Sequence, residues 1–139
     1  MTIRTLTNLG LLAVVTTACA CTQENPALFQ VPFAFHIGTH IMPAGRYSVT
    51  TPIADRSTLA ISCFECKKSV IVITNSITGT RKPEAPTLEF KRYGDVYFLQ
   101  KYKRGAFESG NELPRSKAEV ELANQSTPVQ PALVAVRGH

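Results

Sequence analysis

Hydrophobic and polar positions alternate along several stretches of the chain, and this alternation predicts β-strands. In the first stretch, one face carries Phe29, Val31, Phe33 and Phe35, and the other carries smaller or polar residues. A period of two is the pattern of a strand, here over residues 29–35. Pro32 has no N–H for the ladder and predicts a sheet edge or a bulge inside this strand. Further strands are predicted over residues 47–51, 58–62 and 69–74.

One later segment, Val70–Ile73, is apolar at every position. A strand that is apolar on both sides is usually covered on both sides. This strand is therefore predicted to lie in the middle of a sheet or to bend between two packed layers. Residues 75–87 contain two prolines, a glycine and an asparagine, and they predict a loop.

A β-hairpin is predicted around Gly94-Asp95, a two-residue turn with glycine first that is typical of type II′. Pairing outward from this turn sets Phe90 opposite Leu99, and Leu88 opposite Lys101. The face predicted to point into the core carries Leu88, Phe90, Tyr97 and Leu99. The face predicted to be mixed and half exposed carries Glu89, Lys91, Tyr93, Val96, Phe98 and Gln100.

The predicted strands end near Lys103-Arg104-Gly105, where the pattern changes, and one helix is predicted at about residues 115–125. Ser116 can cap this helix, and Glu119 stands three residues later, where it would complete a capping box. The apolar stripe, made of Ala118, Leu122 and Ala123, is narrow and predicts light packing. Residues 126–139 are predicted to form an extended tail or a last short strand. These elements predict a mainly β domain over residues 29–125, a small antiparallel β-barrel or sandwich with one C-terminal α-helix.

The N-terminus has the three parts of a secretory signal peptide. Arg4 supplies a positive charge, Leu9–Ala18 is an apolar run too short to span a bilayer, and small residues follow. We therefore expect residues 1–20 to be a signal peptide, residues 21–28 to be a linker, and the mature chain to be periplasmic or extracellular. The same stretch is similar to a bacterial lipobox, with Cys19 or Cys21 as the lipid-bearing residue anchored to the outer membrane. The bulky aliphatic residue expected three positions earlier is missing in both cases, so cleavage without lipid is favoured.

Composition narrows the class of protein. The chain has 139 residues, 44% hydrophobic and 18% charged, which fits one folded domain and excludes a disordered chain or a multi-span membrane protein. The formal net charge is +5, and basic residues gather late in the strand region. They could bind an anionic envelope surface, although a solvated face is the commoner meaning. Export argues against a nucleic-acid partner. The basic residues in question are Arg92, Lys101, Lys103 and Arg104.

Motifs for catalysis are missing from the sequence: it has no nucleophile elbow, no phosphate-binding glycine loop and no H-E-x-x-H. An enzyme is therefore disfavoured, and no cofactor is expected. The pair Cys63 and Cys66 is the one suggestive cluster. In an oxidising compartment it predicts a small disulfide at a hairpin tip. A thioredoxin-like redox role would need a helix after the second cysteine, where a strand is predicted.

The sequence leaves open two alternative functions, metal binding and the carriage of a small apolar ligand. His36 and His40 could join Cys63 and Cys66 as four ligands of a metal, although their order and spacing match no known zinc module. The inward aromatic faces could also line a cavity for a small apolar ligand, if a barrel closes around them. A filled core is the default. The cavity-lining candidates are Phe29, Phe33, Phe35, Phe90 and Leu99.

Three motifs are similar to those of a known family: PFAFHIG and PAGRYSV within residues 32–49, FKRYGDVYFL at residues 90–99, and ELPRSKAE at residues 112–119. In this order they resemble a family of small exported bacterial proteins that is abundant in acidobacteria. The resemblance implies export and a β-rich domain, and it supplies no activity. That family usually carries a polar, glycine-bearing turn in place of Cys63–Cys66, which argues against a shared active site there. We expect an exported, non-catalytic β-domain with a binding or structural role in the cell envelope.

Overall fold

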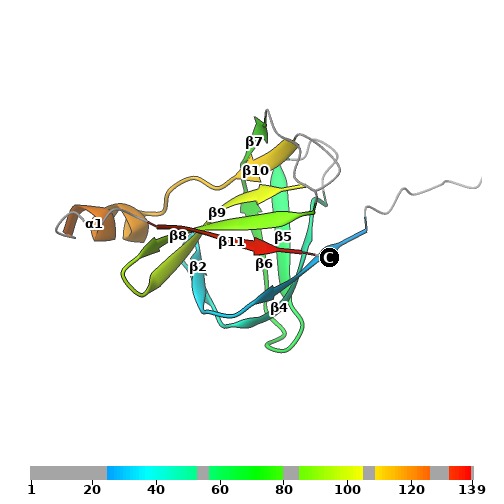
Figure 1. The fold of residues 1–139 in the computed structure, drawn as a ribbon, viewed down its shortest axis with the longest axis horizontal. Coiled ribbons are helices and arrows are strands. Elements are labelled where there is room, and N and C mark those ends of the chain that lie inside the picture. Colours follow the sequence, from blue (N-terminus) through cyan, green and yellow to red (C-terminus); the bar gives the residue numbers. More distant parts are fainter. Residues whose placement is uncertain (1–24, 53–56, 80–84, 105–108, 126–131, 139) are drawn as a thin grey trace, which may run out of the picture.

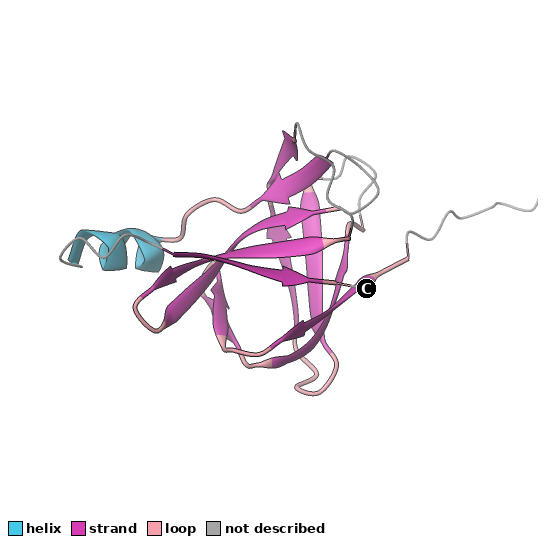
Figure 2. Ribbon diagram, in the orientation of Figure 1, coloured by secondary structure: helices cyan, strands magenta, loops and turns pink. Residues whose placement is uncertain are grey.

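Two β-sheets pack as a sandwich, and one helix lies near the C-terminal end (Figures 1 and 2). The computed structural model describes residues 25–52, 57–79, 85–104, 109–125 and 132–138. Over these ranges, the prediction of a mainly β domain with one C-terminal helix is confirmed. The expected signal peptide, with Cys19 and Cys21, lies outside the described residues.

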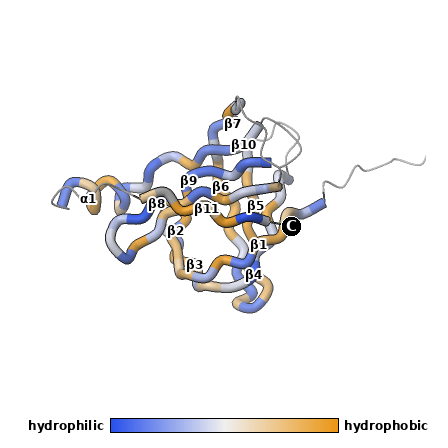
Figure 3. The backbone as a smooth tube through the Cα atoms, in the orientation of Figure 1, coloured by the Kyte–Doolittle hydropathy of each residue, from blue (hydrophilic) through white to orange (hydrophobic). Residues whose placement is uncertain are grey.

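The first sheet is antiparallel and has four strands in the order β1-β4-β5-β6. Its inner face is built by period-two alternation: along β1, Ala27, Phe29 and Val31 are buried and the residues between them are exposed. Figure 3 shows how hydrophobic and hydrophilic positions mix along the strands of both sheets. The strand bounds are β1 (Ala27–Val31), β4 (Gly45–Thr50), β5 (Thr58–Cys63) and β6 (Ser69–Ile73).

The second sheet has the main order β11-β8-β9-β10-β7. A short hairpin, β2 and β3, joins it because His36 of β2 pairs in parallel with Phe98 of β9. The strand bounds are β2 (Phe35–Ile37), β3 (His40–Met42), β7 (Asn75–Thr78), β8 (Thr87–Tyr93), β9 (Val96–Lys103), β10 (Ser109–Glu112) and β11 (Ala132–Arg137).

The two sheets are connected at both of their long edges. At one edge the chain passes from β6 to β7 through Thr74, whose N–H and hydroxyl both donate to the Ser57 carbonyl, at 2.7 and 3.0 Å. At the other edge Phe29 forms an antiparallel bridge with Gly138. A Cβ on Gly138 would stand 2.7 Å from the Phe29 ring, so this approach requires glycine. The chain therefore switches sheets after β6.

The prediction that Val70–Ile73 is covered on both sides is wrong. This segment belongs to β6, which is the last strand of its sheet, and its outward residues Ile71 and Ile73 are 68% and 79% exposed. The alternative prediction, a bend between two packed layers, fits, because the chain continues from β6 in the first sheet to β7 in the second. A continuous apolar run does not distinguish a central strand from an edge strand with an uncovered apolar face.

Aromatic rings fill the space between the sheets. Phe35 is fully buried and contacts Tyr47 and Phe90 edge-on, with ring centroids 5.1 Å apart in both pairs. Phe33 stacks on Tyr97 with centroids 3.9 Å apart. Burial of such a side chain contributes ~1.5–3 kcal/mol. The aromatic side chains that were expected to line a ligand cavity therefore pack against other aromatic rings.

The β8–β9 hairpin confirms its predicted turn and most of its predicted register. Gly94 has φ +62°, and Phe90 pairs with Leu99. A β-bulge between Glu89 and Phe90 then shifts the register, so Leu88 faces Tyr102 and the predicted pairing with Lys101 is wrong. Leu88, Phe90 and Leu99 lie in the core as predicted.

The other face of this hairpin is more buried than predicted. Phe98 and Tyr93 are almost completely covered. His36 stacks on the Phe98 ring at 4.8 Å between centroids, and the Tyr93 hydroxyl donates to Glu119 Oε1 at 3.1 Å. Elements distant in sequence, β2 and the helix, therefore cover residues of a face that alternation alone predicts to be mixed and half exposed.

Three predicted boundaries need correction. The strand predicted over residues 29–35 is divided at Pro32 into β1 and β2, because proline ends the ladder there. The predicted loop 75–87 contains β7, and β10 follows the predicted end of the strands. Both missed strands are short and polar, and they pair with each other across the corner of the sandwich.

The helix α1 (Lys117–Gln125) lies beside the β8–β9 hairpin (Figure 1). Ser116 caps it as predicted, with its Oγ accepting from the Glu119 N–H at 3.2 Å. The Glu119 carboxylate accepts from Tyr93, which is a tertiary contact instead of the second half of a capping box. Ala118 is exposed, contrary to the predicted stripe, while Leu122 and Ala123 are half-buried. None of the described residues belongs to a helix long and apolar enough to cross a bilayer.

Candidate functional site

The free edge of β3 forms one wall of the candidate site. Gly38, with φ +57°, begins the two-residue turn between β2 and β3, so Ile37 and His40 form the hydrogen-bonded pair that closes the hairpin. Hydrogen-bonded pairs alternate along an antiparallel ladder. The N–H and C=O of Ile41, the next residue, therefore point away from β2 and toward the open side.

The free edge of β6 forms the opposite wall. Cys63 N–H donates to the Lys68 carbonyl at 2.8 Å, and Thr74 N–H donates to the Ser57 carbonyl at 2.7 Å. The register of β5 and β6 continues between these points without a shift. Even-numbered residues from 68 to 74 thus bond to β5, and odd-numbered residues turn their backbone groups outward. The outward set is Ser69, Ile71 and Ile73.

The two edges flank an open groove of about 740 Å³. Its lining includes the buried residues Met42 and Val70 and the exposed residues Ile41 and Ile71, which are 61% and 68% exposed. The courses of β3 and β6 can be followed in Figure 3. Residues on the β3 side are Thr39, His40, Ile41 and Met42, and residues on the β6 side are Lys67, Lys68, Ser69, Val70 and Ile71.

The loop between β5 and β6 leads directly into this groove. Cys63 and Cys66 are joined by a disulfide, with Cα atoms 5.6 Å apart, at the tip of the hairpin. Cys66 N–H also donates to Cys63 Sγ at 3.1 Å. Lys67 follows with φ +52°, the left-handed region that a side chain rarely adopts. Lys67 and Lys68 are exposed, and neither forms an ion pair with another described residue.

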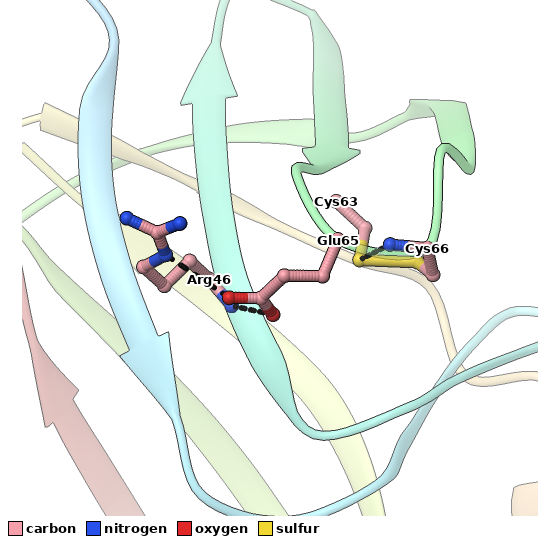
Figure 4. A network of polar contacts seen from close by, with 4 residues as sticks. All are labelled: Arg46, Cys63, Glu65 and Cys66. Carbon is pink, nitrogen blue, oxygen red and sulfur yellow. Dashed lines mark hydrogen bonds and ion pairs between the residues drawn. A yellow bond between two sulfur atoms is a disulfide. The ribbon is translucent and has the colours of Figure 1, made fainter.

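This loop is fastened to the start of β4 by Glu65 (Figure 4). Its carboxylate accepts from the Arg46 backbone N–H at 3.1 Å and from Arg46 Nε at 3.0 Å. Phe64 N–H donates back to the Arg46 carbonyl at 3.0 Å. A Cβ on Gly45 would stand 2.5 Å from Glu65 Oε2, so glycine leaves the space that this carboxylate needs.

The electrostatics of the loop follow from these contacts. The hydrogen bonds from Arg46 hold the pKa of the exposed Glu65 carboxyl below its usual value. Burial, together with the nearby Glu65 charge, raises the pKa of Tyr47 to about 12. Tyr47 therefore stays protonated and donates its hydroxyl to the Pro43 carbonyl. Two contacts therefore hold the chain at the start of β4: Arg46 bonds to Glu65, and Tyr47 bonds to the Pro43 carbonyl.

The residues considered for a metal or redox centre lie in different settings. His36 stacks on Phe98, His40 lines the groove, and the two cysteines are bonded to each other. Within the described ranges, no group of three or more His, Cys, Asp and Glu side chains converges to hold a metal. A strand, β6, follows Cys66, so this pair does not precede a helix whose dipole would stabilise a thiolate.

The basic residues considered for an anionic surface do not form a free patch. Arg104 is only 6% exposed, and its Nη2 donates to Asn111 Oδ1 at 3.1 Å. Lys101 pairs with Glu112 at 3.7 Å, and Lys103 pairs with Glu89. Arg92 is exposed on β8. Three of the four are thus engaged within the fold.

Sequence reasoning did not single out the groove. Its walls come from two hairpins that are far apart along the chain, and only tertiary structure brings them together. The one local signal was the apolar run of β6 directly after two lysines. No protein-family model, curated protein or solved structure matches this chain.

Proposed function

We propose that this protein is an exported, non-catalytic binding domain that engages a protein partner through the groove between β3 and β6. The observation that carries the proposal is the meeting of two strand edges that have no strand partner among the described residues, beside exposed isoleucines. Backbone groups that lack a strand partner can pair with another chain, and exposed apolar side chains favour burial.

Two other edge strands, β7 and β1, differ from β6. Strand β7 is short and polar, and β1 is bridged to the second sheet at Phe29 and Gly138. Natural edges are usually protected by charge, proline or a bulge within the strand. Strand β6 has none of these among its five residues, SVIVI. An uncovered edge of this kind is a liability unless a partner covers it.

Export supports a role in the cell envelope. The leader-like residues 1–20 predict translocation, and a disulfide between Cys63 and Cys66 suits an oxidising compartment. The missing aliphatic residue before Cys19 and Cys21 favours a cleaved, periplasmic or extracellular form over a lipid-anchored one.

Site-specific photocrosslinking in the native host tests this proposal. The photoreactive amino acid p-benzoylphenylalanine replaces Ile71 in one variant and Val120 in a matched control. Val120 is also an exposed apolar residue, 41% exposed, but it lies on α1. We expect a discrete protein adduct from position 71 and none from position 120. Equal adducts from both positions, or no adduct from position 71, would contradict the proposal.

A further inference from the structure

We propose that the groove accepts an extended peptide segment as an added β-strand, antiparallel to β6, with apolar residues at alternate positions and carboxylates at its C-terminal end. This inference rests on the proposed function and names the class of partner. Strand addition of this kind takes affinity from main-chain hydrogen bonds and specificity from alternate side chains.

The backbone pattern determines where a guest strand pairs. Ser69, Ile71 and Ile73 turn their N–H and C=O groups away from β5, and Ile41 does the same on β3. A strand beside β6 would continue the antiparallel order β1-β4-β5-β6 by one more strand. A guest that matches the five residues of β6 would be about 17 Å long.

The side chains around the groove select alternate apolar residues. Because neighbouring residues of a strand point to opposite faces, every second guest side chain would approach Met42 and Val70. The others would lie beside the exposed residues Ile71 and Ile41. The groove volume of about 740 Å³ lies inside the ~300–1,000 Å³ typical of ligand sites.

Charge determines which end of the guest is acidic. Lys67 and Lys68 immediately precede β6, and the C-terminal end of an antiparallel guest would lie beside them. These lysines have no carboxylate partner among the residues that the structure describes. A C-terminal carboxylate or acidic side chains would neutralise them.

A second copy of this chain is the rival occupant. Its β6 could pair with the first β6 edge to edge, but each full chain has a formal net charge of +5, and removal of residues 1–20 with Arg4 leaves +5 − 1 = +4. Like charges oppose association, whereas an acidic peptide is attracted. The observations therefore favour the peptide. The mass of the adduct crosslinked at position 71 distinguishes a peptide-bearing partner from a second copy of this chain.

The test uses an acetylated octapeptide that alternates valine with threonine and ends in two glutamates. Its affinity for the protein is measured by calorimetry and compared with three variants of the peptide. In one, two lysines replace the glutamates; in the second, the glutamates stand at the N-terminal end; in the third, alternate amides are methylated. We expect each change to weaken binding by about tenfold or more, because each removes hydrogen bonds or charge pairing.

A matched pair of protein variants tests the edge itself. Ile71→Pro removes the outward N–H but no hydrogen bond to β5, and proline is tolerated at such edge positions. Ile71→Val keeps that N–H and the apolar surface. We expect binding to weaken by about tenfold in the first and by less than about threefold in the second. Should the proline variant unfold, the methylated peptide tests the reciprocal hydrogen bonds, which guest N–H groups donate to the outward carbonyls of β6.

The outcomes separate this inference from the proposed function. If the octapeptide binds and methylation has no effect, the groove binds partners without strand addition and the inference is overturned. No binding at millimolar peptide overturns the inference as well, while a heterologous adduct from position 71 would still support the proposed function. An adduct of twice the chain mass would identify a second copy and overturn the peptide assignment.

Discussion

Arg46 and Glu65 hold the short loop that carries the lysines of the groove. Both carboxylate oxygens of Glu65 accept hydrogen bonds from Arg46, and Gly45 leaves room for them. The pair is exposed, so solvent screens it and its energetic contribution is small. The contact matters because it fixes the position of the loop, which continues through Cys66 to Lys67.

The Glu65–Arg46 contact predicts a specific pH dependence of stability. The folded-state pKa of Glu65 is lowered, mainly by hydrogen bonds from Arg46, so the stabilisation is present above the unfolded pKa and is lost as pH falls through the folded pKa. Urea unfolding at a series of pH values should show wild type more stable than Glu65→Gln near neutral pH, with the difference vanishing on acidification.

The control for this measurement is Glu121→Gln. Glu121 is exposed on α1 and forms no ion pair with the residues that the structure describes. Its substitution should change stability equally at all these pH values. A difference between wild type and Glu65→Gln that persists unchanged into acid would show that the contact does not depend on the carboxylate charge.

Single residues were predictable where local chemistry decides the outcome. The type II′ turn at Gly94 and the cap at Ser116 follow from side-chain and backbone rules that act over a few residues. Glu119 was not predictable in this way, since its partner Tyr93 is 26 positions away along the chain. The same limit applies to Phe98, which is covered by His36 of another hairpin.

At the scale of elements, alternation predicted the strands with one strongly apolar face. It failed for β7 and β10, whose sequences NSIT and SGNE carry little apolar signal. They form because they pair with each other and because β10 also pairs with β9. The register of β8 and β9 was predictable as far as the bulge at Glu89, which has no marker in the sequence.

The corner between β6 and β7 depends on a buried polar network centred on Asn111. Its Nδ2 donates to Thr74 Oγ1 at 2.7 Å, and its Oδ1 accepts from Arg104 at 3.1 Å. Asn111→Ala would leave a buried guanidinium without this acceptor, which should cost about 3 kcal/mol of unfolding free energy. Urea denaturation measures the loss.

An exposed asparagine provides the comparison for this substitution. Asn124 lies on α1 in contact with solvent, and Asn124→Ala should change the unfolding free energy by less than ~0.5 kcal/mol. A loss below about 1 kcal/mol for Asn111→Ala would mean that Arg104 is satisfied elsewhere and that the corner does not depend on this network.

The part of the chain that the structure describes is a sandwich connected at both edges, with a groove between β3 and β6. Its sheets, core and helix cap follow largely from sequence patterns, but the groove does not. It exists because the β2–β3 hairpin attaches to β9 by a single bridge and leaves a gap to β6. The functional proposal therefore depends on tertiary arrangement, while the expected export depends on residues 1–20.

Backbone amide hydrogen exchange, followed residue by residue by NMR, tests the central claim most directly. In the free protein the amides of Ser69, Ile71 and Ile73 should exchange fast, and those of Val70 and Val72 should exchange slowly, because only the latter two bond to β5. Saturation with the octapeptide should slow exchange at Ile71 and Ile73. Slow exchange at all five amides in the free protein, or no change at saturating peptide, would contradict the account.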